Sequence, residues 1–217
     1  LSAAGAGWLA SETHANALTA FERNSDRACA ELLRRFQRPI YGLNGAHGLY
    51  AASANVTRDE FRRYVESRDI AREFPGARGP GVIQRVARAD AASFVVAERA
   101  DGAAQFAIRS LSDPAHDDLY VIKFIEPLAS NAAAVGVDVG SEAVRRAGLI
   151  RAMDSGQPAI SGVIDLRQES NAAAQVLLYL PLYRQGLPTS SAAERRAALI
   201  GFVYSPIVIA ELLHNIR

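Results

Sequence analysis

The feature that most restricts the fold is an uninterrupted run at residues 10–38, which contains neither proline nor glycine. Such a run predicts one long helix, because the two strongest helix breakers are absent. Pro39 follows directly and is expected to end or kink the helix, since proline lacks the amide hydrogen that a helix needs. Alternating spacings of three and four residues predict a packed or paired stalk helix over 1–39, with a seam at Leu18, Phe21, Ser25, Ala28 and Leu32.

Residues 40–80 predict a helical linker. The stretch 40–53 has the pattern of a helix diluted by glycines. A capping box, "TRDE" at 57–60, predicts a further helix that reaches about Arg68. The stretch "FPGARGPG" at 74–81 is the strongest break in the chain, and we expect a domain boundary there.

Strand patterns follow this break. Alternation predicts strands at 105–110 and 119–125, and the turn-rich "LSDPAHDD" between them predicts a hairpin. Ser141 as N-cap and Gly156 after the last turn delimit a predicted helix. Three more strands are predicted at 160–168, 175–183 and 199–205. A polar loop is predicted at 184–196 and a helical tail at 207–217. Helices that precede a largely antiparallel sheet are typical of an α+β fold.

The composition excludes several classes of protein. The 24 basic and 23 acidic residues leave a net charge of +1, so no strong field favours nucleic acid or an anionic membrane surface. The single cysteine, Cys29, cannot form an internal disulfide, and no Cys/His cluster predicts a metal site. No run of about 18 apolar residues predicts a transmembrane helix within this sequence. Lys123 is the only lysine, an imbalance typical of GC-rich bacterial genomes.

Motifs of known catalytic chemistries are absent from the sequence. It contains no GxSxG, HExxH, P-loop or GxGxxG pattern, and no cofactor is expected. His47 lies where a site is conceivable, although a packed or surface histidine is the simpler interpretation. No nucleophile–base pair is visible, so an enzyme is the least favoured class.

Apolar side chains on the predicted strands can line a small-molecule pocket, namely Phe106, Ile108, Tyr120, Ile122 and Phe124. Asp138 lies between two valines, just before a Gly-Ser turn, and allows two interpretations. It can cap the turn at 139–141, or it can anchor a ligand that donates two N–H groups. The residue pattern alone does not decide between them.

Three groups of segments together resemble the CHASE domain, an extracytoplasmic sensory domain of histidine kinases and nucleotide cyclases. They are "YGLNGAHGLYAASANVTRDEFRRYVES" (41–67), the stretch 120–169 that begins "YVIKFIEPLASNAAAVGVDVGSE", and "LLYLPLYR" with "ERRAALIGFVYSPI". They occur in the order of the family and span roughly residues 21–213. The resemblance implies a stalk helix, a helical linker, and PAS-like modules with antiparallel sheets. The distal, ligand-binding module would be 81–183, and 184–217 would begin a truncated proximal module.

The resemblance also implies a ligand site. Plant members of the family are cytokinin receptors, in which an aspartate of the segment matching "GVDVGSE" binds the adenine N–H edge; Asp138 falls on that position. The matching wall residues are Phe124, Ile160, Leu166 and Gln168, of which Gln168 departs from the plant residue type. The implied partner is an unidentified small molecule, with purine-like and cytokinin-like compounds among the options.

The receptor context follows from the same resemblance. Family members act as homodimers through the stalk, with two flanking transmembrane helices and a cytoplasmic kinase or cyclic-di-GMP output. This places the chain in the periplasm of a bacterial inner-membrane protein. Its abrupt start, "LSAAGAGWLA", fits the exit of a transmembrane helix or a cloning remnant. The leading hypothesis is a non-enzymatic ligand sensor, and the alternative is a ligand-free structural or dimerisation module.

Overall fold

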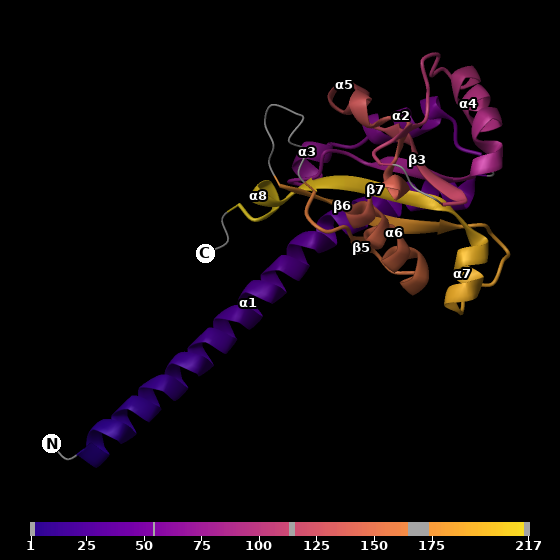
Figure 1. Cartoon of the computed structure of the whole chain (residues 1–217). Helices are drawn as coiled ribbons and strands as arrows, with labels where there is room; N and C mark the ends of the chain where they lie inside the picture. Colours follow the sequence, from indigo (N-terminus) through magenta and orange to yellow (C-terminus); the bar gives the residue numbers. More distant parts are fainter. Residues whose placement is uncertain (1–2, 54, 113–115, 165–173, 215–217) are drawn as a thin grey trace.

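The computed structural model describes residues 3–53, 55–112, 116–164 and 174–214. Figure 1 shows a body made of one sheet and several helices, from which the N-terminal part of α1 (Ala3–Ala52) projects. Helices precede and flank a largely antiparallel sheet, so the predicted α+β class is confirmed.

α1 does not end at Pro39 but continues to Ala52, so an end of the helix at the proline was a wrong expectation. A proline inside a helix costs about 3 kcal/mol. Burial offsets this cost, because Leu43 and Ala46, which follow Pro39, are 2% and 0% exposed and pack on the sheet. The first part of the predicted linker is therefore continuous with the stalk helix.

α2 (Arg58–Glu66) begins at the predicted capping box. The Thr57 hydroxyl accepts a hydrogen bond from the Glu60 amide, and the Glu60 carboxylate accepts one from the Thr57 amide at 2.9 Å. The short helix α3 (Ile70–Glu73) follows, and the predicted break at 74–81 leads from it into the sheet.

The described part of the chain forms one sheet of seven strands in the order β2-β4-β3-β1-β7-β6-β5. Neighbours are antiparallel except β2 and β4, which are parallel. The strands are β1 (Gly81–Ala87), β2 (Arg109–Ser110), β3 (Asp118–Ile125), β4 (Val137–Asp138), β5 (Ala159–Ile160), β6 (Gln175–Tyr183) and β7 (Leu199–Val208).

The hairpin predicted over 105–125 was wrong, because β4 lies between β2 and β3. Only Arg109 and Ser110 of the predicted first strand are paired in the sheet. Phe106 instead donates its amide hydrogen bond to the Ala103 carbonyl at 2.7 Å and buries its ring. The backbone at Phe106 thus forms a local turn, where the alternation of side chains predicted a strand.

β7 lies in the middle of the sheet, between β1 and β6. The boundary expected between residues 183 and 184 therefore separates two strands that pair from Gln175↔Val208 to Tyr183↔Leu199. The described part of 184–217 thus shares one sheet with 81–183. Within it, α7 (Ala192–Ala198) replaces part of the predicted polar loop and begins at a capping box of Ser191 and Glu194.

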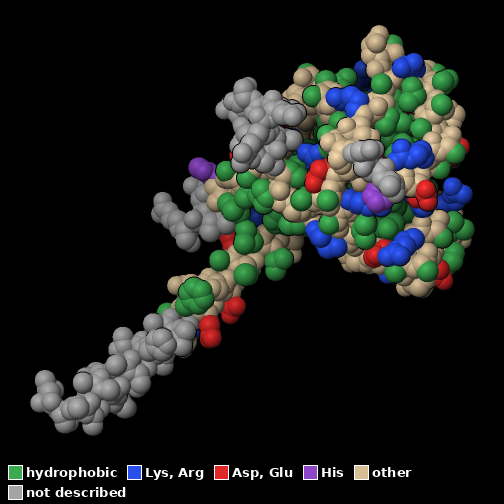
Figure 2. Space-filling view, viewed as in Figure 1, with side chains coloured by type: hydrophobic (Ala, Val, Ile, Leu, Met, Phe, Trp, Pro, Cys, Tyr) green, Lys and Arg blue, Asp and Glu red, His purple; other side chains and the backbone are tan. Residues whose placement is uncertain are grey.

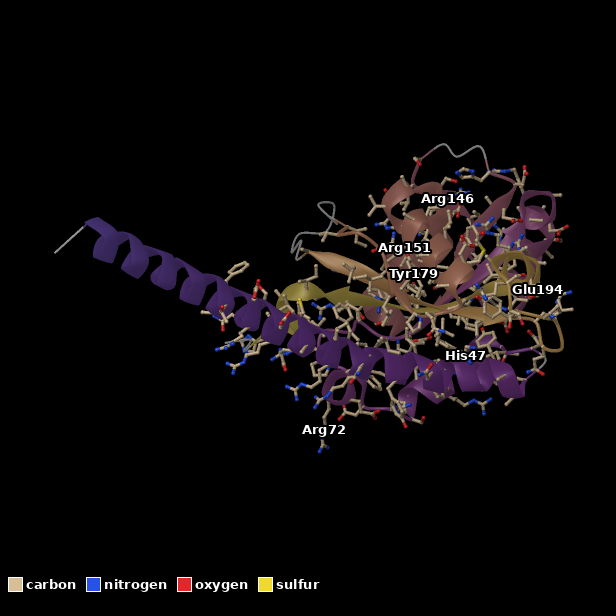
Figure 3. All side chains as sticks on the ribbon, turned by 90° about the horizontal axis from the view of Figure 1, so that it is seen from below. His47, Arg72, Arg146, Arg151, Tyr179 and Glu194 are labelled. Carbon is tan, nitrogen blue, oxygen red and sulfur yellow. The ribbon has the colours of Figure 1, made fainter. Side chains whose placement is uncertain are left out.

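Helices cover both faces of the sheet (Figure 3). α1 and α2 cover one face through a cluster that includes Leu43, Phe61 and Phe124. α6 (Ala143–Ser155) covers the other face through Leu149 and Met153. The remaining described helices and 3-10 turns are α4 (Ala91–Ala100), α5 (Leu128–Asn131), α8 (Ile209–Leu212), Arg88–Asp90, Ala132–Ala134 and Val139–Ser141. β1 and α4 lie in a stretch, 81–104, for which no element was predicted.

A β-bulge at Lys123 changes which side of the sheet β3 faces. Ile83 pairs with Ile122 and its neighbour Val82 pairs with Phe124, so Lys123 is the extra residue. An extra residue reverses the alternation of side chains beyond it. Ile122 therefore faces α6, whereas Phe124 faces α1 and α2.

Candidate functional site

The side chains between α6 and the sheet form a layer, called the α6 layer below. Its members relevant to a site are Tyr120, Ile122, Leu149, Met153, Tyr179, Phe202 and Tyr204. The rings of Tyr120 and Tyr179 each lie 6.0 Å from the ring of Phe202, centroid to centroid. This layer is the main apolar space on the face away from α1.

Asp138 lies at the edge of the α6 layer, at the end of β4, and is 1% exposed. Its Oδ1 accepts backbone hydrogen bonds from Gly140 at 3.0 Å and from Tyr120 at 2.9 Å. The first bond is the turn cap that the sequence allowed, and the second ties β4 to β3. The Ser141 hydroxyl donates to the Asp138 carbonyl at 2.6 Å, so Ser141 is not the helix N-cap; Glu142 caps α6 instead.

The other predicted pocket residues do not all lie together. Tyr120 and Ile122 share the α6 layer. The bulge sends Phe124 to the opposite face, and Phe106 and Ile108 join a third cluster around Val86 and Val121. Ile160 is 39% exposed on β5, at the edge of the sheet. Leu166 and Gln168 lie outside the described residues.

Two tyrosines of the α6 layer, which no sequence pattern indicated, have buried hydroxyl groups that bear on its function. Tyr179 of β6 pairs with Tyr204 of β7 across the ladder. The residues are 0% and 1% exposed, yet neither hydroxyl has a hydrogen-bond partner among the described residues. Burial raises the pKa of both phenols, so they stay protonated at neutral pH.

α6 approaches these tyrosines closely at Gly148. A Cβ atom there would lie 2.8 Å from Tyr179 Cε2 and 2.8 Å from the Cα of Ser161. Arg145 precedes Gly148 by one turn and therefore lies on the same side of the helix. Arg145 is half-buried, and its guanidinium has no hydrogen bond or ion pair with the described part of the chain. Figure 3 shows Tyr179 close to the arginine-rich helix α6.

A second polar cluster lies on the opposite face, around Phe124. Glu98 of α4 is 3% exposed and accepts from Arg58 Nη2 at 2.9 Å, while Lys123 Nζ lies 3.2 Å away. Both cations also lie over the Phe124 ring, 4.9 and 4.8 Å from its centroid. Burial raises the pKa of Glu98, and the two cations oppose that rise. The Tyr50 hydroxyl has no hydrogen-bond partner among the described residues. Burial, and to a lesser extent the charge of the same carboxylate, raises the pKa of Tyr50.

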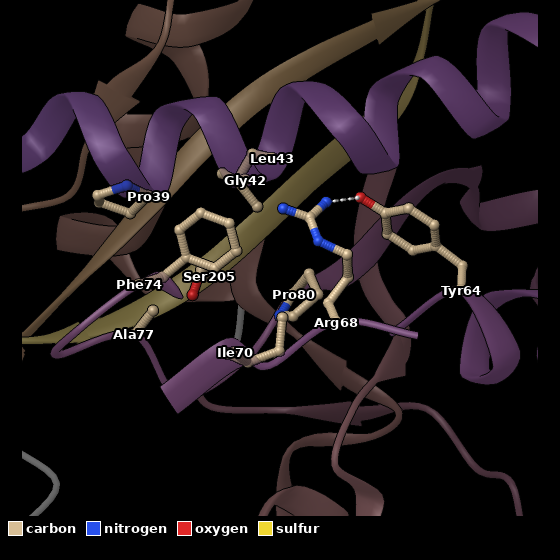
Figure 4. Close-up of a pocket in the computed structure, with 11 residues that line it drawn as sticks. Pro39, Gly42, Leu43, Tyr64, Arg68, Ile70, Phe74, Ala77, Pro80 and Ser205 are labelled. Carbon is tan, nitrogen blue, oxygen red and sulfur yellow. Dashed lines mark hydrogen bonds between the residues drawn. The ribbon is translucent and has the colours of Figure 1, made fainter. Parts of the chain in front are cut away.

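A shallow groove lies where α1 meets α2 and α3, on the α1 face (Figure 4). Its cavity volume is only about 20 Å³, and it is lined by residues that include Pro39, Leu43 and Phe74. Its one cation, Arg68, lies 5.3 Å from the Phe74 centroid and bonds to Tyr64 and Glu73. No predicted site residue lines the groove, and its remaining polar side chain, Ser205, donates to the Pro206 carbonyl at 3.3 Å.

The described residues contain neither a metal site nor a membrane-spanning helix. No group of three His, Cys, Asp or Glu side chains there is placed to hold a metal ion. No described helix combines the length and the hydropathy needed to cross a bilayer. In the view of Figure 2, basic and acidic side chains are interspersed over the body, as the net charge of +1 suggests.

Comparisons with known proteins assign the chain to a family. No curated protein matches the chain. One matching solved structure is described as an extracellular ligand binding receptor from Desulfohalobium retbaense DSM5692; it shares 14% identity at a TM-score of 0.43 over 85% of this chain. The matched part is 27% of the length of that receptor. The CHASE domain model matches residues 54–217, most of the chain. The chain therefore belongs to the CHASE domain family, whose members are extracellular sensor domains rather than catalytic ones.

Proposed function

We propose that this chain is the ligand-sensing input domain of a bacterial membrane receptor and that a small molecule binds in the α6 layer. The observation that carries the proposal is the pair of buried tyrosine hydroxyls that have no partner in the described ranges, in a domain of a sensory family. Small-molecule sites are mainly apolar, with a few polar groups that fix orientation. The α6 layer has this composition, and Tyr120, Ile122 and Asp138 remain proposed wall residues.

Transmission to the stalk has a physical route through the sheet. β6 and β7 present Tyr179 and Tyr204 to the α6 layer, and their alternate residues Leu178, Leu180 and Val203 to the α1 face. A ligand that changes the packing on one face therefore acts on strands that contact α1 on the other. It shifts signalling only if its affinity differs between two states of the stalk. Shifts of about 1–2 Å are typical of such helix interfaces.

A homodimer through the stalk is part of the proposal. The predicted seam continues along α1 at heptad spacing to Pro39 and Ala46, which lie on the buried side of the helix next to Phe36 and Leu43. Before this point α1 projects from the body, and Phe21 of the seam is 70% exposed. Figure 2 shows hydrophobic side chains on this projecting part. A second stalk that packs on the seam would cover them.

The receptor context is proposed on the family resemblance. It comprises a periplasmic location, two flanking transmembrane helices, and a cytoplasmic output of the histidine-kinase or cyclic-di-GMP type. Expression of the entire receptor with a reporter of that output would test it.

A ligand-free dimerisation module is the second candidate, and the closeness of α6 to the sheet favours it. The approach of Gly148 to Tyr179 and Ser161 leaves no room for a side chain at that point. In this case the layer is a core, and signalling would begin elsewhere in the receptor.

A thermal-shift screen against purines, cytokinins, amino acids and small carboxylates distinguishes the two candidates. A sensor gains about 2.7 kcal/mol of stability at a ligand concentration of 100 Kd. Tyr183→Phe serves as the control variant, since its hydroxyl donates to the Met153 carbonyl at 2.9 Å and it lies on the same strand as Tyr179. A compound that stabilises wild type and Tyr183→Phe but not Tyr179→Phe supports a sensor site in the α6 layer. Melting temperatures that no compound changes support the structural module.

A further inference from the structure

The hydroxyls of Tyr179 and Tyr204 are not explained by packing. A buried hydroxyl without a partner costs about 1–3 kcal/mol. Phenylalanine at either position would fill the same space without this cost, and Phe202 already occupies the same layer between Tyr120 and Tyr179. The polar atoms are therefore retained in a place where they lower the stability of the unliganded domain.

The acidic groups around the layer already have partners. Asp138 accepts from the backbone amides of Tyr120 and Gly140. Glu142 accepts from the amides of Val144 and Arg145 at 2.8 and 3.0 Å. Asp154, near the end of α6, pairs with Arg196 at 2.6 Å. Both oxygens of Glu142 and of Asp154 are engaged, and of these three carboxylates only the second oxygen of Asp138, Oδ2, accepts no bond from the described residues.

The groups without partners, in contrast, can all donate. A tyrosine hydroxyl donates one hydrogen bond, and an arginine guanidinium only donates. Arg145 lies on the side of α6 that faces Tyr179, and its charge acts on both phenols. The described part of the α6 layer thus has two hydroxyls and one cation without partners, against one unbonded carboxylate oxygen, Oδ2 of Asp138.

We infer that the ligand of the α6 layer is a small carboxylate, whose oxygens accept hydrogen bonds from Tyr179 and Tyr204 and face the guanidinium of Arg145. This inference rests on the proposed sensor function and names the chemical class of its ligand. Charge-assisted hydrogen bonds between such donors and a carboxylate are about twice as strong as neutral ones. It reverses the polarity expected from the plant receptors, in which an aspartate accepts from the ligand.

The test is thermal unfolding of the chain with acetate, pyruvate, succinate and L-alanine, each at about 10 mM, with adenine as the N–H-donating comparison. Tyr179→Phe and Tyr204→Phe are expected to melt no lower than wild type without a ligand, and to weaken carboxylate binding at least about tenfold. Arg145→Gln should weaken it similarly. Tyr183→Phe should melt lower than wild type and leave carboxylate binding unchanged, because its hydroxyl is already bonded.

Each contrary result has a distinct meaning. Stabilisation by adenine and by none of the carboxylates overturns the carboxylate class but keeps the sensor function. Carboxylate stabilisation that survives both phenylalanine variants overturns the assignment to these tyrosines. A loss of about 1 kcal/mol in the free energy of unfolding of each unliganded phenylalanine variant would mean that the tyrosine hydroxyls bond to buried water. This result also overturns the assignment to these tyrosines. No stabilisation by any of the four carboxylates overturns the inference, whereas the sensor function is overturned only if the wider screen of purines, cytokinins and amino acids also gives no shift.

Discussion

The ammonium group of Lys123 lies 3.2 Å from the carboxylate of Glu98, which is 3% exposed, beside the ring of Phe124. The only lysine of the chain thus occupies the bulge of β3 and connects that strand to α4. Arg58, at the start of α2, bonds to the same carboxylate. One buried acid therefore links the central sheet to two helices.

Replacement of Glu98 by glutamine should destabilise the domain strongly. It leaves Lys123 and Arg58, which are 14% and 17% exposed, without their counter-charge. The removal of one partner from a buried ion pair costs about 3–5 kcal/mol. Urea unfolding should show this loss. Glu66→Gln is the matched control, because Glu66 is 66% exposed in a 3.8 Å pair with Arg62, and it should change the free energy of unfolding by less than about 0.5 kcal/mol. Equal unfolding midpoints for the two variants would disprove the linking role of Glu98.

Asp138→Ala should destabilise the domain in the absence of any ligand. The substitution leaves the buried amides of Tyr120 and Gly140 without their acceptor. Each such amide costs about 1–3 kcal/mol, so we expect a loss of about 2–6 kcal/mol in the free energy of unfolding. Asp117→Ala, at an exposed residue, should change it by less than about 0.5 kcal/mol. A free energy of unfolding equal to that of wild type would contradict the capping role of Asp138 and favour its interpretation as a ligand anchor.

Acidification should weaken the packing of α1 through His47. Burial lowers the pKa of this half-buried histidine below 6.5. Below that pH the unfolded chain takes up a proton that the folded chain does not, so stability falls as the pH falls. We expect His47→Gln to lose less stability than wild type between about pH 7.5 and about pH 5.5 in chemical denaturation. The same loss in both proteins would mean that other groups cause the acid sensitivity.

The seam of the stalk should cross-link in preference to the side next to it. Phe21 and Leu33 are almost equally exposed, 70% and 69%, but only Phe21 lies on the predicted seam. In a Cys29→Ser background, Phe21→Cys should form an intermolecular disulfide faster than Leu33→Cys under mild oxidation. Disulfides need Cα atoms about 4.4–6.8 Å apart, a distance that core positions of paired helices reach. Faster cross-linking of Leu33→Cys would assign the dimer contact to a different face of α1.

Much of the fold follows from local sequence signals. The long helix, the capping box of Thr57 and Glu60, the left-handed Gly156 at the end of α6 and the strands β3, β6 and β7 all have such signals. β1 was missed because Gln84 and Arg85 interrupt its apolar run. α7 was missed although "SAAE" at 191–194 is a capping box that the same rule recognises. The order of strands depends on pairing across the sheet, which no local pattern contains.

The candidate site was less predictable than the fold. Strict alternation assigns Tyr120, Ile122 and Phe124 to one face, and only the pairing register reveals the extra residue at Lys123. Tyr179 and Tyr204 lie in apolar strands where a tyrosine is an ordinary core residue. Their importance depends on the absence of partners for their hydroxyls among the described residues, a property of packing rather than of sequence.

The bulge of β3 reverses which of its residues face each side of the sheet. Tyr120 and Ile122, before the bulge, lie against the α6 layer, while Phe124, after it, stacks on Phe61 of α2 at 5.4 Å between ring centroids. An extended strand transmits displacement along its own axis, because its backbone has little slack. A displacement of β3 along its axis therefore moves its contacts with the α6 layer and with α2 by the same distance. The sheet separates the two layers chemically and couples them mechanically.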